Sequence, residues 1–190
     1  FYHRGVKVIA ISDVSGGLYC PDGLDIDAVS LFLEKKDALL KDYDAPGVSH
    51  ISNEEILTCK CDVLVPAALE NQITEENAGT LNCTYIVEAA NGPTTEEADE
   101  ILEKRGITLI PDIFANSGGV IVSYFEWVQN IQELTWDREQ VNEMLEKLMS
   151  NSFRKLLEIV EECHCTFRMA AYILALRKLI IAEKMKGIFP

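Results

Sequence analysis

Basic residues are scarce in this sequence, which has 17 Lys and Arg against 31 Asp and Glu and a formal net charge of −14. A chain this acidic repels the phosphates of nucleic acids and the head groups of anionic lipids, so we expect neither as a partner. The most apolar run, Ala170–Leu176, is too short to cross a bilayer, and the N-terminal residues FYHRGVK lack the pattern of a secretory signal. We therefore expect no membrane partner.

Histidine is also rare, and the six cysteines do not have the spacing of a metal site. The three histidines, at positions 3, 50 and 164, belong to no catalytic pattern. The pairs Cys59–Cys61 and Cys163–Cys165 differ from the usual Cys-x2-Cys of zinc sites. Dispersed cysteines in a chain that is 48% hydrophobic indicate reduced thiols rather than a disulfide framework. We therefore predict no metal and a cytoplasmic location, or the mitochondrial matrix if the source is eukaryotic.

Short apolar runs alternate with amphipathic segments along the first part of the chain. Buried strands are predicted at Val6–Ile11, Val63–Val65, Tyr85–Val87 and Ile107–Ile110. Helices are predicted to begin behind residues that cap a first turn, namely Asp25, Ser52, Thr74 and either Thr94 or Thr95. Strands that alternate with helices favour parallel βαβ units, so the predicted fold class is α/β with a doubly wound, Rossmann-like parallel sheet.

The pattern after Trp136 is purely helical. Phe167–Ala182 is apolar nearly all round and is expected to be largely buried. We therefore predict a dinucleotide-binding domain over residues 1–135. C-terminal helices over residues 136–190 are expected to pack on it and towards a catalytic domain that lies outside these residues.

A glycine-rich phosphate-binding turn is missing. A Rossmann unit opens with a strand, a G-x-G-x-x-G turn and a helix, and no such motif occurs in this sequence. Phe1–Gly5 resembles the end of that first helix, leading directly into the second strand. We therefore expect an N-terminally truncated piece of a longer polypeptide, with its first strand absent and with no activity on its own.

Asp13 follows the first predicted strand. Dinucleotide-binding sheets carry an acidic residue at this position, where it accepts hydrogen bonds from the adenosine ribose. The alternative is an ordinary turn residue beside Ser12 and Gly16. No basic residue adjoins Asp13 to hold a 2′-phosphate, so NAD is favoured as the cofactor and NADP is the second choice.

The segment Ile110–Trp127, IPDIFANSGGVIVSYFEW, leads from the last predicted strand into a helix. Its loop begins at Asn116 and contains Gly118 and Gly119, which let the backbone approach a bound molecule closely. Asn and Ser suit a helix N-cap, and a helix N-terminus favours an anionic ligand. Ser123 is expected on the second turn of this helix.

Four segments in order resemble the C-terminal domain of glutamate dehydrogenases, in the family that also includes leucine, phenylalanine and valine dehydrogenases. They are IPDIFANSGGVIVSYFEW, DVLVPAALEN at 62–71, EAANGPTT at 88–95 and VIAISDVSGGLYCPDGLD at 8–25. The resemblance runs from Arg4 to Gly187. Two departures are Ala89, often Gly in the family, and Ile121, often Thr.

The resemblance implies a role for six residues. It implies that Asp13 binds the adenosine ribose and that Ala67 and Ala68 lie beside the dinucleotide. Asn91 would lie near the nicotinamide ribose, and Asn116 near the nicotinamide and the substrate. Ser123 would contact the side-chain carboxylate of glutamate. From the residues alone, the alanines and Asn91 also fit ordinary turns, Asn116 a helix cap and Ser123 a structural helix serine.

The resemblance also implies a function, which is NAD(P)-dependent, reversible oxidative deamination of L-glutamate to 2-oxoglutarate and ammonia. The family's catalytic lysine and aspartate belong to an N-terminal domain with no counterpart here, so no catalytic residue is assigned in this chain. A homo-oligomer is expected, a hexamer by resemblance. Two alternatives stay open: a dehydrogenase of apolar amino acids such as leucine, valine or phenylalanine, and a non-catalytic nucleotide-binding fragment. Arg168, in the last helix, is expected to form an ion pair.

Overall fold

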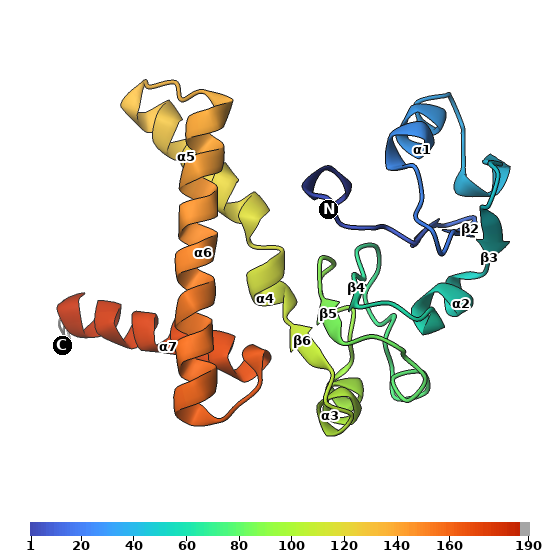
Figure 1. Cartoon of the computed structure of the whole chain (residues 1–190). Coiled ribbons are helices and arrows are strands. Elements are labelled where there is room, and N and C mark those ends of the chain that lie inside the picture. The colour runs from blue at the N-terminus through green and yellow to red at the C-terminus, as the bar shows by residue number, and fades with distance from the viewer. Residues whose placement is uncertain (187–190) are drawn as a thin grey trace. The chain divides into compact units, whose positions relative to one another are not determined.

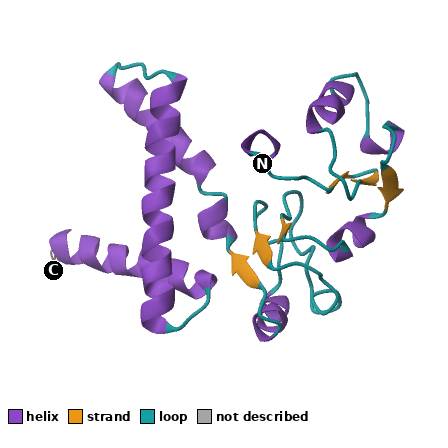
Figure 2. Ribbon diagram, viewed as in Figure 1, coloured by secondary structure: helices purple, strands orange, loops and turns teal. Residues whose placement is uncertain are grey.

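The computed structural model describes residues 1–186 and divides the chain into two units. Unit 1 comprises Phe1–Leu64 and Asn77–Thr84, and unit 2 comprises Val65–Glu76 and the chain from Tyr85 onward. The predicted division into residues 1–135 and 136–190 stays a prediction, since these units divide the chain at other places. Figure 1 follows the elements along the chain, and Figure 2 distinguishes the helices, strands and loops of each unit.

Unit 1 contains short strands and short helices joined by long loops (Figure 2). Its elements are a 3-10 turn at Tyr2–Arg4, β1 (Ala10–Asp13), β2 (Gly16–Tyr19), α1 (Ile26–Leu33), a 3-10 turn at Leu40–Asp42, β3 (Ser49–Ile51), α2 (Asn53–Thr58) and β4 (Val63–Leu64). The helix starts at Asp25 and Ser52 agree with the sequence, whereas the helix predicted behind Thr74 is wrong, because residues 75–80 form turns. Asp25 accepts a hydrogen bond from Ala28 N, and Ser52 forms a capping box with Glu55.

The sheet of unit 1 is antiparallel in the order β1-β2-β3, which the alternation of strands and helices did not predict. Only Val14 and Ser15 separate β1 from β2, and so short a connection permits only antiparallel pairing. The sequence pattern missed β2 because its glycines are unusual in strands. β1 also begins at Ala10 rather than Val6. The buried core of this unit consists of Leu18, Cys20, Leu24, Val29, Leu40 and Tyr43.

Unit 2 contains the parallel strand pair that the alternation predicted. Its elements are β5 (Tyr85–Val87), α3 (Glu96–Lys104), β6 (Thr108–Ile110), α4 (Asp112–Ala115), α5 (Gly118–Gln132), α6 (Arg138–Cys163) and α7 (Phe167–Lys186). β5 pairs with β6 in parallel, with Ile86 opposite Leu109, and α3 forms the crossover between them. The two strands therefore end at the same edge of the sheet.

The C-terminal helices pack on one another in unit 2. α7 crosses the long helix α6, and α5 lies against α6 (Figure 1). Their core contains Leu156, Ile159, Ala170 and Ala171, and the rings of Phe114, Phe153 and Phe167 stack beside it. The prediction that Phe167–Ala182 is largely buried is wrong for the described residues. Leu176, Leu179, Ile180 and Ile181 are more than half exposed, because α6 covers only part of the surface of α7.

Among the described residues, no helix combines the length and the apolar character that a membrane crossing requires.

Candidate functional site

Two asparagines meet beyond the carboxyl ends of the parallel strands of unit 2. Asn91 lies shortly after β5, and Asn116 follows α4, which begins directly after β6. The Asn116 Nδ2 group donates a hydrogen bond of 2.6 Å to Asn91 Oδ1. The structure thus joins EAANGPTT and IPDIFANSGG at the edge where open α/β sheets bind ligands.

Asp112, at the first turn of α4, ties the Asn91–Gly92 turn to the end of β6. Its Oδ2 atom accepts a hydrogen bond of 2.8 Å from Gly92 N, and its Oδ1 atom accepts one of 2.7 Å from Ile113 N. Its own backbone N–H donates to Glu88 Oε2 at 2.8 Å. Each asparagine is therefore attached to a backbone segment that Asp112 holds.

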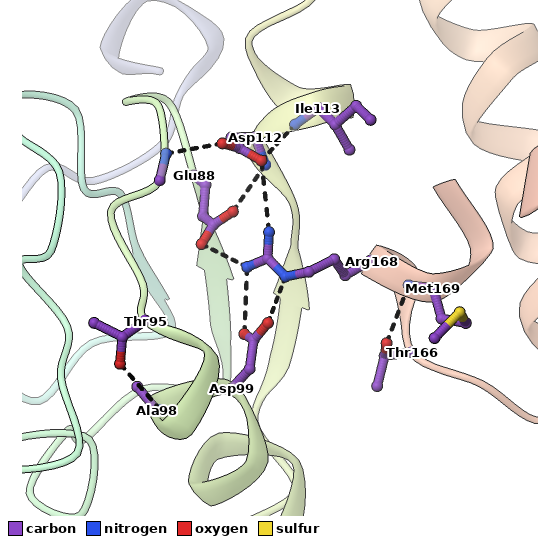
Figure 3. Close-up of polar contacts among 10 residues, drawn as sticks. Glu88, Thr95, Ala98, Asp99, Asp112, Ile113, Thr166, Arg168 and Met169 are labelled. Carbon is purple, nitrogen blue, oxygen red and sulfur yellow. Dashed lines mark hydrogen bonds and ion pairs between the residues drawn. The ribbon is translucent and has the colours of Figure 1, made fainter. Parts of the chain in front are cut away.

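Arg168, near the start of α7, contacts carboxylates from three other segments (Figure 3). Its Nη2 atom lies 2.8 Å from Glu88 Oε1, its Nε and Nη2 atoms donate to Asp99 of α3, and its Nη1 atom lies 3.5 Å from Asp112 Oδ1. Burial alone would lower the pKa of Arg168, but the hydrogen bonds with Asp99 and Glu88 outweigh it and raise that pKa. The guanidinium therefore stays charged throughout the physiological range.

The sequence predicted an ion pair for Arg168 but not its three partners. The sequence held one cue to these partners, which is that Glu88 directly follows the apolar strand β5. The structure shows that the Glu88 side chain is fully buried. A carboxylate in such a place requires a cation and hydrogen-bond donors. No local pattern indicates that the cation comes from α7.

Ala67 and Ala68 lie beside the Glu88–Asn91 segment. Pro66 O, immediately before them, accepts hydrogen bonds of 3.0 Å from Ala89 N and from Ala90 N. Both alanines are exposed. The space above Gly92 is open, because a Cβ added there would meet no atom within 4 Å. The turn therefore presents amides and small groups at an accessible surface.

Ser123 lies within α5 and is exposed. Its hydroxyl forms no hydrogen bond with the described residues, so the back-bonded helix serine is not observed. Ser117, by contrast, donates from Oγ to Phe114 O at 2.7 Å. Neither Asn116 nor Ser117 caps the helix as expected. α5 begins at Gly118, and its N-cap residue Ser117 makes no side-chain capping bond.

Asp13 ends β1, at the β1–β2 turn. It belongs to unit 1, whereas the other five predicted site residues belong to unit 2. Its Oδ1 atom accepts hydrogen bonds from Ser15 N at 2.7 Å and Ser15 Oγ at 2.5 Å, and its Oδ2 atom accepts one of 3.0 Å from Leu40 N. Burial would raise the pKa of Asp13, but these hydrogen bonds and nearby Lys41 lower it overall. A carboxylate has about four acceptor positions, so about one remains for an external donor.

None of the six cysteines forms a disulfide bond in the described part of the chain. Burial, together with nearby Cys83, raises the pKa of Cys61 to about 11, which keeps this thiol protonated near neutral pH. Within residues 1–186, no group of three or more His, Cys, Asp or Glu side chains is arranged to hold a metal ion.

Comparison with known proteins identifies the family. Residues 1–187 match the model of the glutamate/leucine/phenylalanine/valine dehydrogenases. The chain belongs to this family. It is 47% identical over 186 residues to a glutamate dehydrogenase of Thermotoga maritima, which covers 98% of this chain and 44% of the relative. It is 48% identical to the cryptic catabolic NAD-specific glutamate dehydrogenase GudB of Bacillus subtilis, covering 98% of this chain and 43% of GudB.

The fold agrees with that family. A solved hetero-hexameric glutamate dehydrogenase of Thermus thermophilus, in a leucine-bound form, superposes with a TM-score of 0.87 at 31% identity. The match covers 100% of this chain and 44% of that one. The chain therefore has the Rossmann-like α/β fold of this family, and it spans less than half the length of the relatives it matches.

Proposed function

We propose that this chain is the cofactor-binding part of an NAD-dependent glutamate dehydrogenase, which interconverts L-glutamate with 2-oxoglutarate and ammonia. The observation that carries the proposal is the Asn91–Asn116 hydrogen bond, because it brings two family motifs together at the ligand-binding edge of a parallel sheet. Glutamate dehydrogenases at 47–48% identity support the substrate, and GudB, named NAD-specific, supports the cofactor. NADP is the second choice. We assign no proton-transfer group to these residues.

The exposed surface of unit 2 fits a nicotinamide nucleoside chemically. After their mutual hydrogen bond, Asn91 Nδ2 is left as a donor and Asn116 Oδ1 as an acceptor. A carboxamide and ribose hydroxyls need both kinds of partner. Ala67 and Ala68 and the open space at Gly92 permit close approach. The bound cofactor would accept a hydride from the substrate, while the two amides would orient its reactive ring.

Asp13 is proposed to bind the adenosine ribose and to favour NAD. Its lowered pKa keeps it ionised, and about one acceptor position remains for a ribose hydroxyl. A negative charge there opposes a 2′-phosphate. The neighbouring residue Val14 is 91% exposed and uncharged, so it adds no phosphate partner.

Ser123 is proposed to select glutamate over apolar amino acids. Its hydroxyl is exposed and does not bond back to its own helix, so it can donate to the substrate's side-chain carboxylate. A site built to hydrogen-bond one group rejects analogues that lack it. A homo-oligomer, most simply a hexamer, belongs to the same proposal, since the similar Thermus thermophilus enzyme is a hetero-hexamer. So does a cytoplasmic location, in keeping with cysteines that form no disulfide bonds among the described residues.

The test measures glutamate-dependent NAD reduction by the full-length gene product and by its Ser123→Ala variant. The lost hydrogen bond to a charged group costs about 1.5–3 kcal/mol, which corresponds to a loss of roughly ten- to hundredfold in kcat/KM for glutamate. The kcat/KM for norvaline, whose side chain is apolar, should change little. Ser30→Ala, at an exposed serine of α1, is the matched control. Absence of glutamate-dependent reduction contradicts the function, and equal losses for both substrates contradict the role of Ser123.

A further inference from the structure

Arg168 supplies the positive charge for a cluster of three carboxylates that come from different parts of unit 2 (Figure 3). Glu88 follows β5, Asp99 belongs to α3 and Asp112 opens α4. The Glu88 side chain is fully buried, with 0% of its surface accessible to water. Removal of one partner from such a buried pair leaves an uncompensated charge, whereas an exposed surface pair contributes little.

The cluster reaches the asparagine pair through Asp112. One oxygen of Asp112 holds Gly92 N, next to Asn91, while Asp112 itself begins the short helix that ends directly before Asn116. Glu88 Oε2 holds the backbone N–H of Asp112. Without a cation, Glu88, Asp99 and Asp112 repel one another. Any displacement of Asp112 in response would move the backbone segments that carry both asparagines.

We infer that Arg168 is a positioning residue for the bound nicotinamide cofactor, acting through Glu88 and Asp112 on the Asn91–Asn116 pair. The inference rests on the proposed function for the identity of the ligand. Arg168 makes no hydrogen bond to either asparagine, so its effect on the ligand is indirect. Arginine suits this position because its planar fork reaches several carboxylates at once, which the single ammonium of lysine cannot do.

The test measures the Kd of NADH by fluorescence with the full-length gene product, which does not depend on turnover. Arg168→Met should weaken NADH binding about tenfold or more, a size typical of a lost charged hydrogen-bond network. Arg168→Lys keeps the charge and should recover only part of the affinity. Arg177→Met is the matched control: Arg177 lies on the same helix and forms a two-pronged ion pair with Glu162, remote from the asparagines in sequence and contact. It should bind NADH as the wild type does.

The outcomes are distinct. Wild-type affinity in Arg168→Met, even with a lower melting temperature, overturns the inference, because Arg168 would then only stabilise the fold. Equal weakening in Arg168→Met and Arg177→Met also overturns it. A wild-type protein that binds NADH but reduces no NAD with glutamate contradicts the proposed function alone, and the comparison of the variants still decides the role of Arg168.

Discussion

Two adjacent threonines should respond to the same substitution with opposite changes in stability. Thr94 is buried, and its Oγ1 atom has no hydrogen-bond partner among the described residues. Thr95 is the N-cap of α3, and its Oγ1 atom accepts a hydrogen bond of 3.3 Å from Ala98 N. Valine keeps the β-branched shape of threonine and replaces the hydroxyl with a methyl group, so each variant changes only the hydrogen-bonding group.

The expected magnitudes follow from these environments. A buried hydroxyl without a partner costs about 1–3 kcal/mol, so Thr94→Val should raise the free energy of unfolding by about 1 kcal/mol or more. Loss of a Thr cap typically costs about 1 kcal/mol, and the long 3.3 Å bond at Thr95 favours the lower part of that range. A domain of about 150–250 residues shifts its melting temperature by about 2–4 °C per kcal/mol. The longer full-length product should shift by less, upward for Thr94→Val and downward for Thr95→Val.

The assay is thermal unfolding of the full-length gene product and both variants, followed by circular dichroism under identical conditions. Hydrogen exchange of the α3 amides locates the change, because only Thr95→Val should reduce protection of the first turn. A loss of stability in Thr94→Val would refute the reasoning, since it would mean that the Thr94 hydroxyl has a partner that stabilises the fold.

Two further predictions concern Asp13. Asp13→Asn keeps an acceptor for Ser15 but removes the charge, so kcat/KM for NADP relative to NAD should rise by roughly fivefold to tenfold, and further with Val14→Lys; an unchanged ratio would mean that Asp13 does not bind the ribose. The pKa of Asp13 is lowered below 3.8, so its stabilising effect is present above about pH 4 and is lost as pH falls through the lower folded-state pKa. The difference in unfolding free energy between wild type and Asp13→Asn should therefore stay constant from pH 7 to about pH 4 and shrink below that pH. A difference that does not shrink below about pH 4 would contradict this.

Local chemistry was predictable from the sequence where neighbours along the chain decide it. The caps at Asp25, Ser52 and Thr95 are set by side chains that bond the backbone three residues later. β5, α3 and β6 were predicted because their apolar periodicity reflects burial, and their parallel pairing follows from the intervening helix. The motifs around Asn91 and Asn116 were also recognisable, although their hydrogen bond was not.

Tertiary structure decided what depends on residues distant in sequence. The antiparallel sheet of unit 1 depends on a two-residue turn that strand patterns overlook, and the exposure of α7 depends on how little of it α6 covers. The Asn91–Asn116 bond spans 25 positions, and the Arg168–Glu88 pair spans 80. The sequence by itself determined which groups line the ends of the strands. Only folding determined which of them meet, because a charge on one helix recognises a carboxylate through space and leaves no periodic pattern in the chain between them.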